Sequence, residues 1–391
     1  MNNLFANRVK NLKASATLAM AQKARELISQ GIDVINMSLG EPDFQTPDFV
    51  KSSAHEAIDN NFTYYFPVPG FLDLREAICE KLFRDNSLSF KPENIVVSTG
   101  AKQSLANIVF ALVNEGDEVI IPAPYWVSYR DMVSFAGGKA ITPLAGVEQD
   151  YKITPEQLKN SISEKTKVLM FSNPSNPTGS VYSENELKEL GEVLAQYPHI
   201  IIVSDEIYEH IFFDDKPVSI ASILKDQNPI VVVNGLSKGF AMTGWRLGYM
   251  AAPLELAKAC SKIQSQFTSG ASSISQKAAV AALKADPNEV SYMRETFRKR
   301  RDLLMAGLKE IKGLKLSKPE GAFYLFVDFS SWLNGKTCSD LSQDILEKAH
   351  IALTPGIAFG APGYLRFSYA VSEERIVEAI DRLKSYQSTM S

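Results

Sequence analysis

The sequence predicts an α/β protein, with a mainly parallel sheet in a large domain and a smaller α+β domain. Predicted strands and helices alternate from about residue 95 to 250, which is typical of a parallel sheet with helices on both faces. Within that region, the runs 168–171, 199–205 and 230–233 are rich in apolar residues, as expected for strands buried on both sides. Roughly the last hundred residues mix short strands with helices, which indicates a separate α+β unit.

The composition excludes several classes of protein. The chain has 391 residues, 45% of them hydrophobic, which is enough for a large core and more than one domain. Its net charge of −4 gives no electrostatic reason to expect nucleic-acid binding. No apolar run approaches the ~20 residues of a membrane helix, and the N-terminus lacks the apolar core of a secretory signal. We therefore expect a cytoplasmic protein that binds neither nucleic acid nor membranes.

Cysteines and histidines give no sign of a disulfide framework or a metal site. The 3 cysteines are few, odd in number and far apart, which fits a reducing compartment. The 4 histidines show no metal-ligand spacing. We expect no metal.

The first part of the chain is predicted to contain an arm, three helices and a strand. Gly31 ends the first helix, and Pro47 occupies the first turn of the second. The expected elements are an amphipathic arm at 1–13, helices at 15–30, 46–60 and 72–85, and a strand at 32–37.

The remaining elements follow the same reasoning. Asp286-Pro287 is predicted to break two long helices from each other. Further strands are expected at 94–98, 118–121, 139–144, 322–329, 364–369 and around 315; further helices are expected at 132–138, 154–162, 184–196, 254–285, 288–311, 339–349 and 373–385.

Lys238 is the residue around which the predicted site is built. It follows the buried strand 230–233 and the turn pair Asn234-Gly235. Burial lowers the pKa of a lysine and leaves a nucleophilic amine, which can form a Schiff base with a carbonyl. An isolated lysine more often just extends from a strand end toward solvent, so other residues must support the hypothesis.

Supporting residues follow the other two buried strands. Asp205 ends one of them, with Tyr208 three residues on, and Asn176 follows the other. Ligands of open α/β sheets bind outside the carboxyl ends of the strands, so these side chains are expected to share one crevice with Lys238 and Arg246. A carboxylate for a protonated ring nitrogen, a lysine for an imine and an arginine for a phosphate together suit pyridoxal phosphate.

The turn after strand 94–98 is a further candidate for the phosphate. Gly100, Ala101 and Lys102 open the next helix, where free amides and the helix dipole favour an anion. Many strand-to-helix turns look alike, so this pattern alone does not establish a site.

Three motifs resemble those of the class I aminotransferases of the fold-type I pyridoxal-phosphate family. They are Asn173-Pro-Ser-Asn-Pro-Thr-Gly179, Ser204-Asp-Glu-Ile-Tyr208, and Ser237-Lys238 with Arg246. Each is weak alone, but their order and spacing are a strong signal. The resemblance covers the whole chain and implies a seven-stranded sheet. It also implies an arm and small-domain segment at 1–45, a large cofactor domain at 46–290 and a small domain at 291–391.

The resemblance implies roles around pyridoxal 5′-phosphate. Lys238 is expected to bind the cofactor and then move the substrate's α-proton as general acid and base. Asp205 is expected to keep the ring nitrogen protonated, and Tyr208 and Asn176 to hydrogen-bond the ring oxygen. The other implied cofactor contacts are Trp126 stacked on the ring, and Gly100, Ala101, Lys102, Ser237 and Arg246 at the phosphate. A core tryptophan is the alternative for Trp126. Some members carry a hydroxyl where this chain has Gly235, so one phosphate ligand is missing.

A second group is implied for the substrate. Arg366 lies in an apolar strand, where an arginine needs an anion; a buried ion pair is the alternative to a substrate carboxylate. The resemblance places the substrate's α-carboxylate at Arg366 and the Gly40 backbone, beside Trp126 and Asn176. Lys102 matches the aspartate aminotransferase subgroup in which a lysine, helped by hydroxyls matching Ser15 and Thr17, binds the distal carboxylate. The alternative for Lys102 is a solvated lysine in a first helical turn, a position that the dipole disfavours.

The implied reaction is ping-pong transfer of an amino group between an acidic L-amino acid, aspartate or glutamate, and a 2-oxo acid. Aromatic amino acids or prephenate remain open as substrates. A pyridoxal-phosphate lyase on the same fold, a ligand-sensing regulator and a purely structural protein are the other hypotheses. We expect no added DNA-binding domain, because the chain is acidic and starts almost directly at the arm; a structural protein would not need Asp205, Lys238 and Arg246.

Two further expectations come from the resemblance. Tyr65 matches a tyrosine that reaches the phosphate of the neighbouring subunit, which implies a homodimer; an aromatic side chain packed under a loop is the alternative. Ala123-Pro124 and Asn176-Pro177 resemble the positions of the family's cis peptides.

Overall fold

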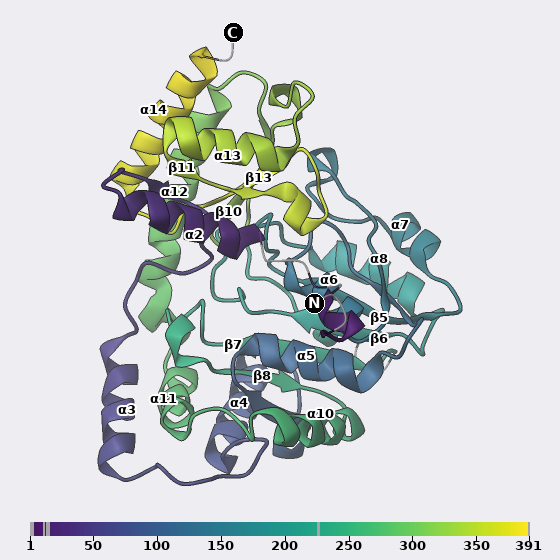
Figure 1. Ribbon diagram of the computed structural model, residues 1–391. Helices are drawn as coiled ribbons and strands as arrows, with labels where there is room; N and C mark the ends of the chain where they lie inside the picture. Colours follow the sequence, from purple (N-terminus) through teal and green to yellow (C-terminus); the bar gives the residue numbers. More distant parts are fainter. Residues whose placement is uncertain (1–3, 11, 13–15, 225–226, 390–391) are drawn as a thin grey trace.

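The computed structural model describes residues 4–389, except residues 11, 13–15 and 225–226. Figure 1 shows two parts, a lower one built on a large sheet and an upper one that contains the C-terminal helices. Among the described residues, no helix combines the length and apolar character needed to cross a membrane.

The large sheet has seven strands in the order β2-β8-β7-β6-β5-β3-β4. Their bounds are β2 Ile95–Ser98, β3 Glu118–Ile120, β4 Lys139–Ile141, β5 Thr166–Ser172, β6 Ile201–Asp205, β7 Ile230–Gly235 and β8 Gly248–Ala251. All pairs are parallel except those that β8 makes with β2 and β7. This confirms the mainly parallel, seven-stranded sheet. Ser172 pairs with Asp205, and Asp205 with Val233, so β5, β6 and β7 end together at one edge.

Helices cover both faces of the sheet because the strands alternate apolar side chains to both sides. Val97, Leu169 and Val232 face one helical layer, and Val96, Val203 and Val233 face the other. The first layer consists of α3 Asp48–Asp59, α4 Leu72–Asn86, α7 Pro155–Ser161, α8 Glu184–Leu194, α9 Ile220–Leu224 and α11 Ser273–Lys284. The second consists of α5 Ala101–Leu112, α6 Ser128–Phe135 and α10 Leu254–Phe267.

The upper part contains a four-stranded antiparallel sheet in the order β12-β13-β10-β9. Its strands are β9 Lys315–Leu316, β10 Tyr324–Asp328, β12 Thr354–Pro355 and β13 Tyr364–Ser368, with helices α12 Ser291–Lys309, α13 Cys338–Ala349 and α14 Glu373–Ser388. Near it, β1 Ile35–Asn36 pairs in parallel with β11 Ile351–Ala352. Ile35 and Met37 share an apolar core with Phe297 and Phe367, so a segment from the start of the chain packs into this part. Helix α2, Ala16–Ser29, lies beside it, and a short helix α1, Asn7–Lys10, precedes it.

Three sequence predictions of elements were wrong. The single helix expected at 254–285 is two helices, α10 and α11, because Gly270 adopts a φ of +132° and a Cβ there would lie 2.9 Å from the Phe66 ring. The strand expected at 32–37 is reduced to the two residues that pair with β11. Strand β8 was not expected, because it directly follows the glycine-broken loop around Arg246 and is only four residues long.

One of the two expected cis peptides was also placed wrongly. Ala123-Pro124 is cis, as expected, but the second cis bond is Asn173-Pro174 and not Asn176-Pro177. Strand β5 ends at Ser172, so the chain already turns at the first of the two Asn-Pro pairs. Asn176 instead lines the cavity described below.

Candidate active site

A cavity of about 330 Å³ lies at the carboxyl edge of the large sheet, between the two parts of the molecule. Ligand sites of this fold class are expected at that edge, and the volume is within the range of small-molecule pockets. The predicted site residues that line it are Gly40, Ala101, Lys102, Trp126, Asn176, Asp205, Tyr208, Ser237, Lys238, Arg246 and Arg366. Residues predicted from distant segments of the sequence therefore meet around one space.

Lys238 lies in the turn after β7, and its ammonium group donates a hydrogen bond to the backbone oxygen of Gly40. The pKa of Lys238 is lowered to about 8, mainly by burial and also by Arg366 and Arg246, against the effects of Glu41 and Asp205. A Cβ at Gly40 would lie 2.5 Å from the Tyr324 hydroxyl, so a glycine allows the backbone at this position to pack closely against Tyr324. The lysine is thus held in the cavity as an amine that loses its proton readily.

Asp205 ends the central strand β6 with a buried side chain. Burial raises the pKa of this carboxyl to about 6, although the hydrogen bond from Tyr129, the backbone amide of Ile207 and the charge of Lys238 all act in the opposite direction. The Tyr129 hydroxyl donates to Asp205 Oδ2 over 2.7 Å, and the Ile207 amide donates to Oδ1 over 3.3 Å. A cationic ligand group next to Asp205 would be strongly favoured in this setting.

A chain of hydrogen bonds joins the phenol of Tyr208 to Arg366. Asn176 Nδ2 donates to the Tyr208 hydroxyl over 3.3 Å, and its Oδ1 accepts from Arg366 Nη1 over 2.9 Å. The Tyr208 hydroxyl also lies 2.8 Å from that of Tyr324. Burial, followed by the neighbouring Tyr324, raises the pKa of Tyr208 well above its ordinary value, so the phenol remains a hydrogen-bond donor.

Arg366 lies on β13 and is almost entirely buried, with 2% of its surface exposed. Its guanidinium group donates to neutral acceptors: Asn176, the Ser38 backbone oxygen over 2.6 Å and Thr354 over 3.4 Å. Its Nε finds no partner among the described residues, and burial lowers its pKa. The alternative of a buried structural ion pair finds no support in the described part of the chain. A buried guanidinium of this kind suits a carboxylate ligand.

The turn between β2 and α5 forms the other end of the cavity. Gly100 adopts a φ of +83°, and a Cβ there would lie 2.5 Å from Arg246 Nη2. Arg246 donates to the Thr243 backbone oxygen over 2.7 Å and leaves the rest of its guanidinium facing the cavity. The first amides of a helix have no acceptor within the helix, so those of Ala101 and Lys102 are available to an anion. Ser237, which is buried, lines the same space.

Gly235 explains why one hydroxyl is missing from the phosphate end. A Cβ at this position would lie 3.0 Å from both the Gly248 Cα and the Leu247 oxygen. The antiparallel pair Gly235–Gly248 thus brings the backbones of β7 and β8 close together. A Cβ at Gly248 would in turn lie 2.2 Å from the amide nitrogen of Ala101, so both glycines allow the start of α5 to approach β8.

Lys102 and Trp126 form one wall of the cavity. The ammonium group of Lys102 lies 4.9 Å from the centroid of the Trp126 ring. Lys102 is exposed overall, but partial burial lowers its pKa, as does the nearby Arg246, while Asp131 opposes the shift. Trp126 meets Tyr129 edge to face, with 5.4 Å between ring centroids. The wall is therefore both aromatic and cationic.

Of the predicted site residues not yet placed, only Tyr65 has a side chain that the structure describes. The Tyr65 side chain is fully exposed, at 100% of its surface, so packing under a loop is excluded within this chain. Ser15 lies outside the described residues, and Thr17 is described only as part of helix α2. Neither prediction for these hydroxyls is tested.

Sequence reasoning missed Tyr129 and Tyr324 as parts of the site. Tyr129 lies in the first turn of helix α6, whereas Trp126 precedes that helix, so no helical spacing in the sequence linked the two rings. Tyr324 stands in the apolar strand β10, where only a structure shows that its hydroxyl reaches Tyr208.

The residues present fit a phosphorylated pyridine aldehyde. Arg246 and the Gly100 turn offer an anion site, Asp205 offers a carboxylate for a protonated ring nitrogen, and Lys238 offers an amine for a carbonyl. Arg366 remains for a second anion, which must belong to a substrate.

Comparison with known proteins gives one consistent family. Residues 32–383 match the model of aminotransferase class I and II. An aspartate/prephenate aminotransferase of Nitrosomonas europaea is 46% identical over 97% of this chain and 99% of its own length. The crystal structure of an aspartate aminotransferase from Rhizobium meliloti is 40% identical, covers 98% of both chains and superposes with a TM-score of 0.94. An aspartate aminotransferase from Thermus thermophilus with maleate is also 40% identical, covers 97% of this chain and 99% of its own, and has a TM-score of 0.93.

Proposed function

The chain belongs to the class I and II aminotransferases, and on that basis we propose that it moves an amino group between an acidic L-amino acid, aspartate or glutamate, and a 2-oxo acid. One observation carries the choice of substrate. Two cations of different elements, Lys102 on α5 and Arg366 on β13, line the same cavity. A ligand with two carboxylates pairs with both, whereas a monocarboxylate leaves Lys102 with only the carboxylate of Asp131 nearby as a counter-charge.

The cofactor of this family is pyridoxal 5′-phosphate, whose conjugated ring withdraws electrons from the carbon that loses its proton. Lys238 supports its attachment, and the Gly100 turn, Ser237 and Arg246 offer contacts for its phosphate. The buried carboxylate of Asp205 favours a protonated ring nitrogen, because a positive partner removes the cost of ionising Asp205 in an apolar setting. Trp126 offers a flat face for the ring.

Lys238 is the group suited to move the proton at the substrate's α-carbon. A lysine with a pKa of about 8 is neutral in about one tenth of the molecules at pH 7, far more than an ordinary lysine, so it can accept a proton and return it. Asn176 and Tyr208 are placed to hydrogen-bond the ring oxygen of the cofactor, while Arg366 holds the substrate through its α-carboxylate. The Gly40 carbonyl accepts from Lys238 and so fixes the position of the amine along the wall of the cavity.

Prephenate is the second candidate substrate, since several relatives are named aspartate/prephenate aminotransferases. It is a 2-oxo acid with a second carboxylate on an unsaturated ring, so the same two cations apply. The position of Lys102 against the Trp126 ring favours this candidate, because a cyclic substrate carboxylate at Lys102 would also contact an aromatic face.

The same proposal includes the assembly and the division of the chain. The full exposure of Tyr65, next to Tyr64 with 81% of its surface exposed, supports a homodimer in which the Tyr65 phenol completes the site of the partner subunit, because this phenol does not line the cavity of its own chain. We propose a cytoplasmic enzyme. The separate apolar cores support a large domain at 46–290 and a small domain formed by 291–391 with the segment 1–45.

A visible absorbance spectrum of the purified protein, taken with pyridoxal phosphate and then with L-aspartate, tests the proposal. We expect a cofactor band that L-aspartate removes and 2-oxoglutarate restores, without loss of ammonia or another leaving group. A band that only neutral amino acids remove would overturn the acidic substrate. Product formed from cysteine or a similar amino acid in the absence of an oxo acid would instead indicate a lyase.

A further inference from the structure

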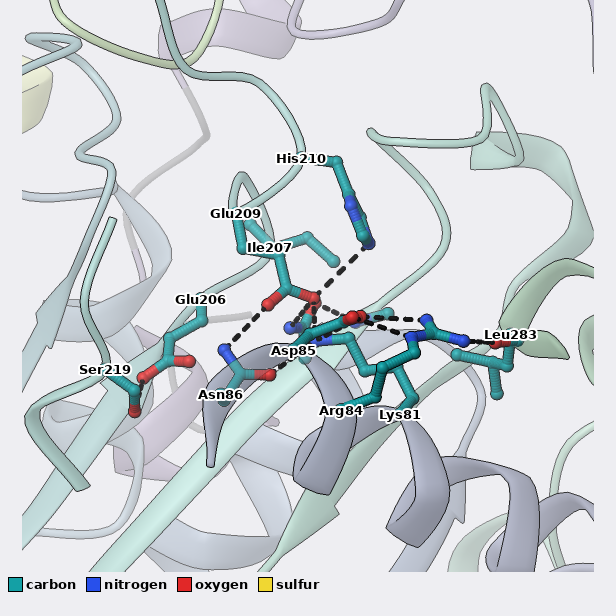
Figure 2. A network of polar contacts seen from close by, with 12 residues as sticks. Lys81, Arg84, Asp85, Asn86, Glu206, Ile207, Glu209, His210, Ser219 and Leu283 are labelled. Carbon is teal, nitrogen blue, oxygen red and sulfur yellow. Dashed lines mark hydrogen bonds and ion pairs between the residues drawn. The ribbon is translucent and has the colours of Figure 1, made fainter. Parts of the chain in front are cut away.

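A buried cluster of charges, shown in Figure 2, contains none of the residues assigned above. Its centre is the ion pair between Lys81 of α4 and Glu209, whose side chains are 1% and 7% exposed. Lys81 also donates to Asn86 Oδ1 over 2.8 Å, and Asp85 lies 3.9 Å from its ammonium group. Arg84 pairs with Asp85 at the outer side of the cluster.

Stability alone is a poor explanation for such a pair. Removing two charges from water is costly, and apolar residues of similar volume often stabilise a core equally well or better. A buried pair does impose a single arrangement on the groups that satisfy it. The contacts of Glu209 indicate which arrangement that is.

The Glu209 carboxylate joins three elements. One oxygen accepts from Asn234 Nδ2 of β7 over 2.7 Å as well as from Lys81, and the other accepts from Asn86 Nδ2 over 3.1 Å. Asn234 in turn accepts, through its side-chain oxygen, from the Gly235 amide over 2.7 Å. Helix α4, the segment after β6 and the end of β7 are therefore tied to one carboxylate.

Both segments tied to the carboxylate carry cavity residues. Glu209 directly follows Tyr208, and Asn234 lies four residues before Lys238. A second contact supports the link: His210 packs against Gly239, where a Cβ would lie 2.8 Å from the His210 side chain, and its ring lies 5.5 Å from that of Phe240. Residues next to Tyr208 in the sequence thus contact residues close to Lys238 in the sequence.

We propose that Lys81 and Glu209 are positioning residues, which fix the phenol of Tyr208 relative to the amine of Lys238. Glu209 ties the segment of Tyr208 to Asn234, on the segment of Lys238, and Lys81 holds Glu209 in place. The proposal rests on the proposed aminotransferase function. Lys81 keeps Glu209 ionised despite its burial, and the pKa of Glu209 is accordingly lowered to about 2, by Lys81 and then by His210, against the effect of burial. An ionised carboxylate can accept from Lys81, Asn86 and Asn234 together.

Glu209→Gln tests the proposal, because it keeps the shape of the side chain but removes the charge that pairs with Lys81 and replaces one of the two acceptor oxygens, which serve Lys81, Asn234 and Asn86, with a donor. We expect the pH midpoint of the visible cofactor absorbance to shift, since Tyr208 no longer meets the cofactor in the same position. We also expect kcat to fall by about 10- to 100-fold with little change in KM, as for other misplaced catalytic groups. Lys81→Met should act in the same direction, and Lys81→Arg should restore part of kcat.

Glu118→Gln is the matched control. Glu118 is a buried carboxylate on β3 at the opposite edge of the same sheet, where it accepts from Ser163 over 2.6 Å and from Lys139 over 3.0 Å. The Glu118→Gln substitution should lower the thermal midpoint of unfolding while leaving the absorbance midpoint and kcat unchanged. If Glu209→Gln behaves like Glu118→Gln in these two readouts, the proposal is wrong.

One further variant and the unsubstituted protein distinguish two other outcomes. If Glu209→Gln does not fold, Asn234→Ala removes the link to β7 but leaves the ion pair, and an unchanged absorbance midpoint and kcat in that variant overturn the proposal. If the unsubstituted protein itself shows no cofactor band and no transamination, the proposed function fails first, independently of Lys81 and Glu209.

Discussion

The Tyr129 hydroxyl donates a 2.7 Å hydrogen bond to Asp205 Oδ2, so a helix on one face of the sheet fixes the carboxylate at the end of the central strand. Both side chains are buried. The bond lowers the pKa of Asp205, whereas burial raises it, and the balance of the two leaves a pKa of about 6. Tyr129 therefore controls how far Asp205 is ionised at neutral pH.

Replacing Tyr129 with phenylalanine should weaken cofactor binding. Without the phenol, the pKa of Asp205 rises further, and a smaller fraction of the carboxylate is available to a protonated ring nitrogen. A hydrogen bond to a charged group of this kind contributes about 1.5–3 kcal/mol, so we expect the Kd of pyridoxal phosphate at pH 7 to rise by about tenfold or more. Tyr151→Phe is the control, because the Tyr151 phenol is also buried and donates over 2.7 Å, but to the Phe326 backbone oxygen. Equal affinities for the two variants would contradict the role of Tyr129.

The raised pKa of Asp205 also predicts how stability depends on pH in the cofactor-free protein. The folded protein holds the Asp205 proton up to about pH 6, whereas the unfolded chain loses it near 3.8. A carboxyl with a raised pKa stabilises the fold below the unfolded pKa, and this contribution is lost as the pH rises through 6. Relative to Asp205→Asn, the protein should lose about 3 kcal/mol of unfolding free energy between pH 4 and 6, with no further change above.

Chemical denaturation of both cofactor-free proteins from pH 4 to 8 measures this difference. Glu206, whose pKa burial raises to about 7, titrates in an overlapping range. Because Glu206 is present in both proteins, its contribution cancels in the comparison. A difference that stays constant from pH 4 to 8 would show that Asp205 ionises normally in the fold.

The sequence predicted the strands of the large sheet better than the ends and breaks of its helices. Strands β5, β6 and β7 are apolar runs, because both of their faces are buried, so the pattern of residues alone marks them. The break between α10 and α11 depends on the contact of Gly270 with Phe66, about two hundred residues earlier in the chain, and no local pattern reports such a contact. Strand β8 is equally dependent on its neighbours, since it pairs with β2 and β7.

The site shows the same limit. Lys238 and Asp205 could be predicted because each follows a buried strand, and the strand order brings their ends together. The residues that change the ionisation of Asp205 or position the segments of the site could not be predicted. Tyr129 reaches Asp205 across 76 positions of sequence, and Glu209 reaches Lys81 across a still longer interval, so both contacts depend on the packing of helices against the sheet. Ser15 and Thr17 remain predictions.

Replacing Arg366 with lysine should lower kcat/KM for every substrate with an α-carboxylate. A lysine cannot donate at the same time to Asn176, the Ser38 carbonyl and a ligand carboxylate in the planar geometry of a guanidinium group. Truncating one partner of a buried charge pair costs about 2–5 kcal/mol, so we expect kcat/KM to fall by about 100-fold or more for L-aspartate and for neutral amino acids alike. Arg301→Lys, at another buried arginine, is the control for stability, with its Nη1 donating to the Pro319 oxygen over 3.0 Å. A loss confined to dicarboxylates would contradict the proposed contact.

Replacing Lys102 with methionine should instead change selectivity. Methionine keeps an unbranched side chain against the Trp126 ring but removes the charge. We expect kcat/KM for L-aspartate to fall by about 10- to 100-fold, as for the loss of one charge partner, while that for L-phenylalanine is preserved. Lys188→Met, at an exposed lysine of α8 that pairs with Glu184, should change neither value. A parallel fall for both amino acids would mean that Lys102 acts on the cofactor and not on the distal carboxylate.

A mixed dimer tests whether Tyr65 acts across the subunit interface. Tyr65 is fully exposed in the single chain, while Lys238 lines the cavity of that chain. If Tyr65 serves the partner's site, a dimer of one Tyr65→Ala subunit and one Lys238→Ala subunit contains one site with both defects and one with neither. Random pairing of the two chains then leaves about one quarter of all sites intact, because half of the dimers are mixed. Co-expressed variants should therefore recover about a quarter of the unsubstituted activity, although Lys238→Ala alone has none. If Tyr65 acts within its own subunit, every site of the mixed dimer carries one defect, and co-expression adds nothing to the residual activity of Tyr65→Ala.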